Sequence, residues 1–409
     1  MSAAPAPAWS RDILLAIACA ALIVTVSMGV RQSFGLFLPP LGRDLDLGRE
    51  AFGFAIAVQN LLFGLVQPFV GALSDRFGAR RVVLAGGLLY ALGLGLAASA
   101  QLPHGLLAAL GLFVGLGLAG TTFVVLLGSI GHWVRPEQRS VAFGLVTAGG
   151  SLGQFAVVPL AQLMIGQLGW RGAMLGLLVL LLVSLLAILG LKRGAPCFAA
   201  DEPGAGSLGS ALRSASRHPH YWLLNGGFFV CGFHIAFVAT HFPAYLVDQG
   251  LSAGVGAAAL ALIGLFNIAG SWMFGVWGGR HSRPGLLGAL YAGRALSMAL
   301  FLLLPLSPAS TLMFAAVFGF LWLGTVPLTS GAVASMFGPR YLSTLYGVVF
   351  LSHQVGSFIG AWWAGRLFDR TGSYDLVWQV SIALGLAAAA VSFATRDRPV
   401  GERAAMAPA

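Results

Sequence analysis

Two long apolar runs are separated by the short charged stretch Gly71-Ala72-Leu73-Ser74-Asp75-Arg76-Phe77-Gly78-Ala79-Arg80-Arg81. A helix needs roughly 20 apolar residues to cross a bilayer, and both runs are long enough. The glycines permit a tight turn and close helix approach, while the arginines favour an anionic membrane face. Asp75 can cap or pair at a helix end. The pattern predicts two membrane-spanning helices joined by a structured polar loop.

The composition extends this prediction to the whole chain. Of 409 residues, 58% are hydrophobic and only 9% are charged, and the mean hydropathy is +0.87. Soluble domains carry about 25% charged residues, so a soluble multidomain protein is excluded. The net charge of +10 comes from basic residues gathered in short loops, which indicates membrane orientation and not a nucleic-acid partner. Three scattered cysteines give no disulfide framework or metal spacing, so no metal or other cofactor is expected.

Apolar runs bounded by proline, glycine or charge predict an all-α membrane protein with twelve transmembrane helices in two pseudo-symmetric six-helix bundles. The expected spans are 12–38, 51–72, 82–101, 104–133, 138–164, 170–190, 220–247, 255–278, 285–305, 309–337, 341–366 and 374–395. We expect an N-terminal bundle over 1–191, a cytoplasmic linker over 192–219, a C-terminal bundle over 220–396 and a cytoplasmic tail over 397–409.

The distribution of arginine and lysine predicts that both termini are cytoplasmic. Under this topology sixteen basic residues lie on the cytoplasmic side and five on the other, and basic residues favour cytoplasmic loops. The five are Arg43, Arg49, Arg171, Arg366 and Arg370. The short loops and the lack of a targeting sequence predict a multi-pass protein of the cell inner membrane.

The two halves repeat weakly, as two bundles related by an axis along the membrane normal should. Gly144, Gly153 and Phe155 recur 203 residues later as Gly347, Gly356 and Phe358. Closely spaced glycines on two spans also predict tight helix contacts. These glycines are Gly144, Gly149, Gly150, Gly153, Gly356, Gly360 and Gly365.

The stretch 71–81 resembles the loop between helices 2 and 3 of the major facilitator superfamily, Gly-x-Leu-x-Asp-Arg-x-Gly-x-Arg-Arg. The resemblance implies the twelve-helix fold of that superfamily and the function of a secondary transporter, not an enzyme. We expect this loop to act as a conformational latch in which Asp75 contacts the other half. The latch residues are Gly71, Asp75, Arg76, Gly78 and Arg80.

All thirteen acidic residues fall in loops or at span ends. Proton-driven sugar symporters and multidrug antiporters of this superfamily usually place an acid near the middle of a helix. Its absence argues against a cationic substrate.

Two arginines lie within spans, where a central arginine costs roughly 2.5–3.5 kcal/mol on insertion scales. Arg31, in the outer part of the first span, is interpreted as the anchor of an anionic substrate, with snorkelling to the outer headgroups as the alternative. Arg294 lies near the middle of the ninth span, which usually lies outside the bundle in this superfamily. A structural bond to backbone carbonyls or to a neighbouring helix is favoured for Arg294.

Further polar residues fall on helices expected to line a central cavity. Hydrogen bonds between helices are the simpler explanation for asparagine and glutamine. Histidine can also carry a proton near neutral pH, so His234 and His353 are candidates for proton coupling. The candidate substrate-binding residues are Arg31, Gln32, Asn60, Gln154, Asn225, His234, Asn267 and His353.

Segments 31–40, 144–153 and 365–374 resemble the monocarboxylate transporter and oxalate–formate antiporter branch, most closely its bacterial members. That branch carries a substrate-binding lysine where Arg31 stands. The Asp–Arg pair of animal members on helix 8 is missing here, and Asn267 is the candidate polar anchor of that helix. One monocarboxylate held by Arg31 therefore fits better than a dicarboxylate.

We expect a monomeric transporter that moves a small organic anion, most directly a monocarboxylate, together with a proton by alternating access. Its partners are the anion, protons and the lipid bilayer.

A proton-driven exporter of drugs or metabolites and a carboxylate exchanger are the alternatives. Pro159 comes late in the fifth span and follows valine, which counts against the Gly-Pro motif of exporters. A ligand sensor and a membrane enzyme fit less well, because both tails are short and no buried nucleophile or metal cluster is visible.

Overall fold

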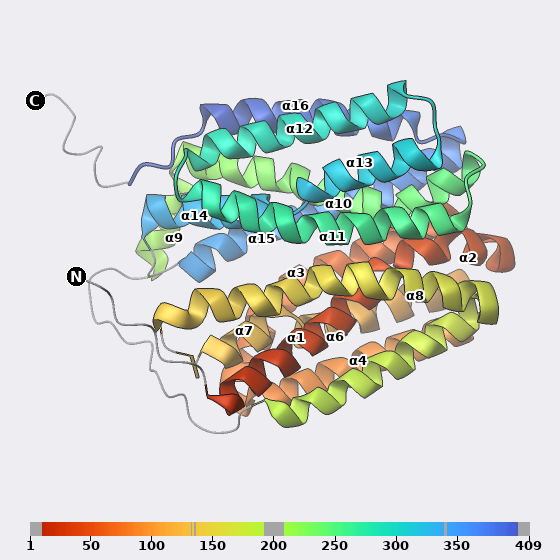
Figure 1. Cartoon of the computed structure of the whole chain (residues 1–409), viewed down its shortest axis with the longest axis horizontal. Coiled ribbons are helices and arrows are strands. Elements are labelled where there is room, and N and C mark those ends of the chain that lie inside the picture. Colours follow the sequence, from red (N-terminus) through yellow and green to blue (C-terminus); the bar gives the residue numbers. More distant parts are fainter. Residues whose placement is uncertain (1–9, 132, 135, 192–207, 339–341, 400–409) are drawn as a thin grey trace, which may run out of the picture.

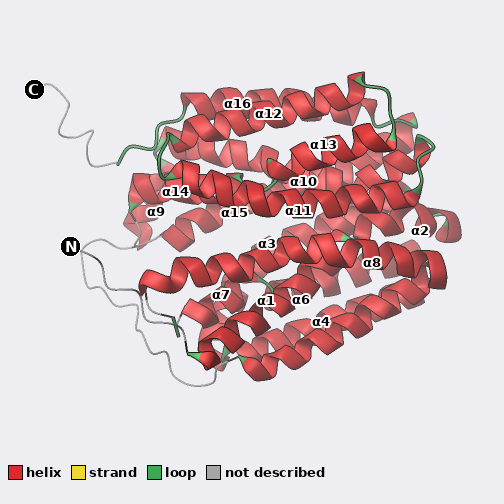
Figure 2. Ribbon diagram, viewed as in Figure 1, coloured by secondary structure: helices red, strands yellow, loops and turns green. Residues whose placement is uncertain are grey.

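The computed structural model describes residues 10–131, 133–134, 136–191, 208–338 and 342–399. Every regular element within these ranges is a helix (Figure 2). The first half contains α1 (Arg11–Gln32), the 3-10 helix η1 (Phe34–Phe37), α2 (Leu38–Leu45), α3 (Arg49–Phe77), α4 (Ala79–Ser99), α5 (Pro103–Leu106), the π-helix η2 (Leu107–Phe113), α6 (Val114–Thr121), α7 (Phe123–Gly131), α8 (Pro136–Leu185) and the 3-10 helix η3 (Leu186–Gly190). The second half contains α10 (Pro219–Asp248), α11 (Ala253–Gly278), α12 (Arg283–Leu303), α13 (Pro308–Phe320), α14 (Thr325–Phe337), α15 (Leu342–Thr371) and α16 (Asp375–Ala394), and α9 (Leu208–Ser216) lies between the halves in sequence.

The helices form two bundles that lie side by side (Figure 1). Helices α1 to α8 make the lower bundle of the figure, and α10 to α16 make the upper one. The beginning of α1 and the end of α16 lie at the same end of the molecule, on the left in this view. The predicted all-α membrane fold is confirmed.

The number of long helices is consistent with the twelve predicted spans. Ten segments in the described ranges are long and apolar enough to cross a membrane. One of them, Ala142–Gly190, has 49 residues and is kinked at Gly169, where φ is 68° and ψ is 173°. Glycine adopts such a positive φ without steric strain, so two spans meet there. The 30-residue helix α15 is also long enough to cross a bilayer.

Two predicted spans are interrupted, which the sequence pattern did not indicate. Thr122 leaves the helical region between α6 and α7, with φ −118° and ψ −162°. Helix α13 ends at Phe320, and α14 begins at Thr325. Thr122 and Thr325 are separated by the same 203 residues as the repeated glycines. Within a membrane the freed backbone groups need partners from side chains, so these breaks fix where polar residues must lie.

The expected glycine contacts join the same pair of helices in each half. A Cβ atom on Gly153 of α8 would lie 1.9 Å from the carbonyl oxygen of Thr25 in α1. A Cβ atom on Gly356 of α15 would lie 2.0 Å from the carbonyl oxygen of Phe229 in α10. Only glycine allows these backbones to approach so closely, and the two contacts are related by the internal repeat.

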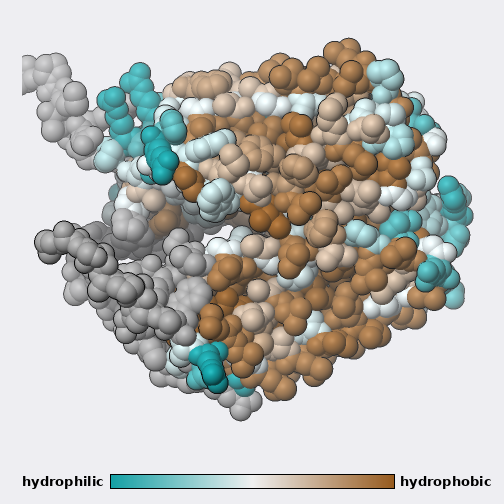
Figure 3. All heavy atoms as spheres, viewed as in Figure 1, coloured by the Kyte–Doolittle hydropathy of each residue, from teal (hydrophilic) through white to brown (hydrophobic). Residues whose placement is uncertain are grey.

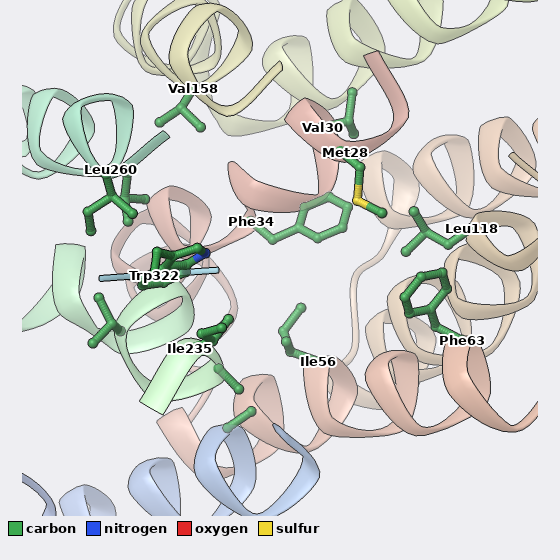
Figure 4. Packing of buried hydrophobic residues seen from close by; sticks show 14 of the residues in the cluster. Met28, Val30, Phe34, Ile56, Phe63, Leu118, Val158, Ile235, Leu260 and Trp322 are labelled. Atoms are coloured by element: carbon green, nitrogen blue, oxygen red, sulfur yellow. The ribbon is translucent and has the colours of Figure 1, made fainter. Parts of the chain in front are cut away.

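The outer surface is apolar, as a lipid-facing surface must be. Phe69, Trp272 and Leu303 are 66%, 71% and 80% exposed, and apolar residues cover most of the face seen in Figure 3. Inside, buried side chains of both halves belong to one cluster, including Phe34 and Ile56 from the first half and Ile235 and Trp322 from the second (Figure 4). Exposed apolar area of this extent indicates a surface covered by a bilayer.

Candidate substrate site between the two halves

Arg31 lies in the last turn of α1 and contacts α3. Its Nη2 donates to Oδ1 of Asn60 at 2.5 Å, and its guanidinium carbon lies 5.5 Å from the ring centre of Phe63. Arg31 is partly exposed, whereas Asn60 is buried. Among the described residues no carboxylate forms an ion pair with Arg31. Within the described structure, the hydrogen-bond partner of this intramembrane cation is therefore a neutral amide.

Two of the predicted site residues, Gln154 and Asn267, connect the two halves, and Gln32 bonds to Gln154 within the first half. Nε2 of Gln32 donates to Oε1 of Gln154 at 3.2 Å, and Nε2 of Gln154 donates to the carbonyl oxygen of Leu260 in α11 at 2.9 Å. Nδ2 of Asn267 donates to Oγ of Ser151 in α8 at 2.8 Å. A polar row thus follows the contact between α8 and α11.

Asn267 has a second role at the break between α13 and α14. Its Oδ1 accepts a hydrogen bond from the backbone N–H of Leu323 at 2.9 Å. This bond satisfies a backbone donor that the interrupted helix cannot pair, so Asn267 ties the break to the junction between the halves.

The predicted histidines lie at different distances from the junction. His353 stacks on Phe350 with ring centres 5.7 Å apart, and Phe350 contacts Phe63, the ring beside Arg31, at 6.2 Å. His234 instead faces the outer helix α16, where Nε2 donates to the carbonyl oxygen of Ser381 at 2.8 Å. His353 is thus linked to Arg31 through two aromatic rings, while His234 points away from the first half.

Asn225 is buried within the second half. Its Nδ2 donates to the carbonyl oxygen of Tyr221, one turn earlier in α10, at 2.8 Å. The structure therefore groups Arg31, Gln32, Asn60, Gln154 and Asn267 at the junction and places Asn225 and His234 elsewhere.

Arg294 has the structural bonds expected for it. Its Nε donates to the carbonyl oxygen of Leu321 at 2.9 Å, and its Nη2 donates to the carbonyl oxygens of Leu321 and Trp322. These carbonyls lie at the break between α13 and α14, where no helical partner is available. Arg294 is completely buried.

The predicted latch forms the turn between α3 and α4. Gly78 has φ 85° and begins the turn, and Arg80 donates through Nε to the carbonyl oxygen of Leu191 at 2.5 Å. Arg76 lies with its guanidinium carbon 5.2 Å from the ring centre of Phe77. These contacts stay within the first half, and the side chain of Asp75 lies outside the described residues. The latch role stays a prediction.

A second polar cluster joins the halves at one end of the molecule, and the sequence did not reveal it. We call it the Arg49 cluster; its members are Arg49, Glu50, Asp248, Arg366, Asp369 and Tyr374. Arg49 forms a bidentate pair with Asp248, with Nη1 2.6 Å from Oδ2 and Nη2 2.7 Å from Oδ1. Its guanidinium carbon also lies 3.6 Å from the ring centre of Phe368.

Asp369 of α15 caps the beginning of α3 in the other half. Its two carboxylate oxygens accept from the backbone N–H groups of Arg49 at 3.0 Å and Glu50 at 2.7 Å. A carboxylate at a helix N-terminus is favoured by the unpaired N–H groups and the helix dipole. This cap therefore holds two bundles together and not only one helix.

Tyr374 connects the Arg49 cluster to the interior. Its hydroxyl accepts from Nη1 of Arg49 at 2.9 Å and lies 2.9 Å from Nδ1 of His241. Burial raises the pKa of the Tyr374 phenol, so the hydroxyl keeps its proton. With one hydrogen bond accepted from Arg49, its own proton can be donated to His241.

Several glycines distant from the Arg49 cluster have open space beside them. A Cβ atom on Gly128, Gly144 or Gly347 would have no atom within 4 Å. Near the Arg49 cluster, by contrast, a Cβ atom on Gly53 would lie 2.3 Å from the carbonyl oxygen of Ala361. Figure 3 shows a hollow between the bundles toward the end where α1 begins and α16 ends. The contacts of the Arg49 cluster join the halves at this end of the molecule, and the hollow lies toward the opposite end.

The chain belongs to the Major Facilitator Superfamily, because the model of that family matches residues 20–361. It is therefore a multi-pass membrane transporter and not an enzyme.

Within this superfamily, the chain is similar to several proteins named monocarboxylate transporters. The chain is 29% identical over 377 residues to monocarboxylate transporter 13 of Bos taurus, covering 89% of this chain and 84% of the relative. It is 30% identical over 380 residues to monocarboxylate transporter 11 of Mus musculus, covering 88% and 82%. An uncharacterized MFS-type transporter of Bacillus subtilis is 26% identical over 88% of this chain and 89% of its own length. The predicted resemblance to the monocarboxylate branch is confirmed.

Solved structures support the fold independently. Two crystal structures of a bacterial homologue of the human lysosomal transporter Spinster, both described as inward-facing, match with TM-scores of 0.70 and 0.72. They cover 94% and 95% of this chain and 95% and 97% of their own, at 15% and 16% identity. At this identity the likeness concerns the fold alone.

Proposed function

We propose that the protein transports a small organic anion, most directly a monocarboxylate, together with a proton. The observation that carries this proposal is Arg31, an intramembrane cation at the junction whose hydrogen-bond partner among the described residues is the neutral amide of Asn60. Arginine stays protonated under all cellular conditions, and a carboxylate is the ligand that matches its planar donors. The similarity to relatives named monocarboxylate transporters supports the same substrate class.

The neighbours of Arg31 favour a small substrate with few polar atoms. Phe63 closes one side of the guanidinium, and buried apolar residues of both halves surround the junction (Figure 4). Gln32, Gln154 and Asn267 supply neutral donors and acceptors along the α8–α11 contact. One carboxylate paired with Arg31 and a short apolar body fit this mixture better than a dicarboxylate, which needs a second cation.

His353 is the proposed proton carrier of this site, since Phe350 and Phe63 link it to Arg31. His234, the other candidate, faces α16, so we give it the lower priority. A proton that enters with the anion makes the loaded site neutral, which lowers the cost of closing apolar surfaces around it.

The contacts that join the halves at one end, with a hollow toward the other, support alternating access as the mechanism. The Arg49 cluster would form the outer closure and the stretch 71–81 the cytoplasmic latch, with the opening in this conformation directed to the cytoplasm. This assignment uses the arginine and lysine distribution, which favours cytoplasmic termini. We further propose that the protein is a monomer of the cell inner membrane, with bundles over 1–191 and 220–396, a cytoplasmic linker over 192–219 and a cytoplasmic tail over 397–409.

The proposal is tested by uptake into liposomes that contain the purified protein. Labelled lactate, pyruvate, acetate, formate and oxalate are offered with and without an inward proton gradient. We expect uptake of a monocarboxylate that rises with the gradient and is lost in Arg31→Gln. The exposed Arg43→Gln variant is the matched control and should transport normally. Failure to take up any of these anions under either condition would exclude the proposed substrate class and favour an exporter.

A further inference from the structure

A buried histidine near the end of α10 lies where three helices meet. His241 is completely buried, and its Nε2 lies 2.7 Å from the carbonyl oxygen of Ala361 in α15. A Cβ atom on Gly53 of α3 would lie 3.4 Å from the same nitrogen. Helices α3 and α15 belong to different halves and pack against each other, so His241 lies beside the contact that joins the halves at this end.

The hydrogen bonds of His241 fix the roles of its two ring nitrogens. A carbonyl oxygen can only accept, so Nε2 carries the proton of the neutral ring and donates it to Ala361. Nδ1 then accepts from the hydroxyl of Tyr374 at 2.9 Å, and this hydroxyl accepts from Nη1 of Arg49 at 2.9 Å. The neutral ring therefore uses its donor and its acceptor, and it connects the backbone of α15 to the Arg49 cluster.

The charges around His241 disfavour a second proton on the ring while the halves are joined. Arg49 acts on the ring electrostatically, and no carboxylate contacts it among the described residues. The acids of the Arg49 cluster are engaged with Arg49, with the beginning of α3 and with Arg366; they are Asp248, Asp369 and Glu50. The acid of α16, Asp375, is exposed, and Arg370 adds positive charge at the end of α15.

A second proton would disrupt the bond between His241 and Tyr374. The protonated ring has two donors and no acceptor. Its Nδ1 would donate to the oxygen of Tyr374, which leaves the phenol proton without its acceptor and places a second cation one hydroxyl away from Arg49. A buried charge without a counter-ion is costly, whereas water hydrates the charged ring once the halves separate.

We propose that His241 is a proton sensor for the contact between the halves: it takes up a proton when this end separates, so acid favours the form that is open at the Arg49 cluster. A group that binds a proton more readily in one of two conformations shifts the balance toward that conformation as the pH falls. Histidine responds at pH values at which ordinary carboxylates stay ionised. Only the assignment of this end to the outside rests on the proposed function; there, acid outside would open the site to the incoming anion and proton.

The separation is measured by pulsed electron resonance between spin labels at Asp46 and Gln249, exposed positions that flank the Arg49 cluster on opposite halves. Cys19 and Cys197 are replaced, and Cys231 is buried. The labelled protein is compared without substrate at about pH 8 and about pH 5.5, on either side of the ordinary histidine value. We expect a longer-distance population that grows about tenfold toward acid. Distances that do not change with pH would overturn the proposal.

The variant His241→Gln identifies the group that takes up the proton. Its amide can donate to the carbonyl of Ala361 and accept from Tyr374 as the neutral ring does, but it does not take up a proton. We expect the longer-distance population to stay small at both pH values. His104→Gln is the matched control, because His104 is exposed on α5, and it should respond as the parent protein does. A full pH response in His241→Gln would assign the sensor to another group.

If His241→Gln does not fold, Tyr374→Phe tests the same bond. Without the hydroxyl, the neutral ring has no donor for Nδ1 in the joined form. We expect the longer-distance population already at about pH 8 and a weaker response to acid. A response equal to that of the parent protein would contradict the role of this bond. Because none of these measurements involves a substrate, a failed uptake assay and a failed sensor are distinguishable.

Discussion

At the scale of single residues, the partner of Arg31 decides whether its positive charge is compensated, and that partner is the neutral amide of Asn60. Its Oδ1 accepts from Nη2 of Arg31 at 2.5 Å, so the amide orients the guanidinium without neutralising it. Replacing Asn60 by aspartate would place a permanent carboxylate against Arg31 and occupy the proposed anion site. We expect Asn60→Asp to weaken substrate binding at least about tenfold, which corresponds to about 1.4 kcal/mol.

The concentration dependence of uptake in liposomes measures this effect as KM. Asn60→Ser is the control, because it shortens the side chain and removes the amide oxygen that accepts from Arg31 but adds no charge, and it should impair binding less. Equal impairment by serine and aspartate would show that loss of the amide itself, and not neutralisation of Arg31, is responsible.

The residue scale also shows what the sequence could predict about the site. Arg31 could be identified as a candidate site residue because an arginine within an apolar span is energetically costly. Its pairing with Asn60 was not predictable, since it depends on how α1 and α3 are rotated about their axes. The same limit applies to His234, which was grouped with His353 by residue type but faces α16 in the structure.

At the scale of helices, glycine contacts fix how α1 packs on α8 and α10 on α15. In Gly153→Ala the new Cβ atom would meet the backbone oxygen of Thr25 at 1.9 Å, and in Gly356→Ala that of Phe229 at 2.0 Å. Backbone cannot move aside as a flexible side chain can. We expect each substitution to cost about 1–3 kcal/mol, the range of overpacked interiors. Thermal unfolding of the detergent-solubilised protein should show a lower midpoint.

Gly144→Ala is the matched control on α8. No atom lies within 4 Å of its added Cβ, so the variant should unfold at the wild-type temperature or slightly above it, since alanine favours helix over glycine. A Gly153→Ala protein as stable as Gly144→Ala would contradict the close α1–α8 approach.

Helix breaks mark the limit of prediction at this scale. Periodicity and hydropathy located the spans, but they predicted continuous helices over 104–133 and 309–337. The break between Phe320 and Thr325 forms because Arg294 and Asn267, distant in sequence, supply partners for its freed carbonyls and N–H groups. A local pattern does not contain such long-range partners.

At the scale of the whole molecule, the Arg49 cluster determines which end is closed. Its contacts join segments separated by 199 to 325 positions in sequence, so they could not be predicted from a local motif. Isolated exposed ion pairs contribute about 0–1 kcal/mol each. Here a bidentate pair, a helix cap and an aromatic contact act together on two rigid bundles, so their loss should shift the balance between closed and open forms at this end.

The double variant Arg49→Gln/Asp369→Asn should therefore populate a form that is open at this end. Spin labels on the exposed positions Asp46 and Gln249, which flank the cluster on opposite halves, report the separation of the bundles by pulsed electron resonance. Cys19 and Cys197 are replaced first, and Cys231 is buried from the label. We expect a longer-distance population that is absent in the unaltered protein.

Asp375→Asn is the control. Asp375 is an exposed carboxylate at the same end that forms no ion pair in the described structure, so this variant should leave the distances unchanged. If the double variant and this control give the same label distances, apolar packing between α3 and α15 holds the two halves together at this end. The polar cluster then contributes nothing to the closure.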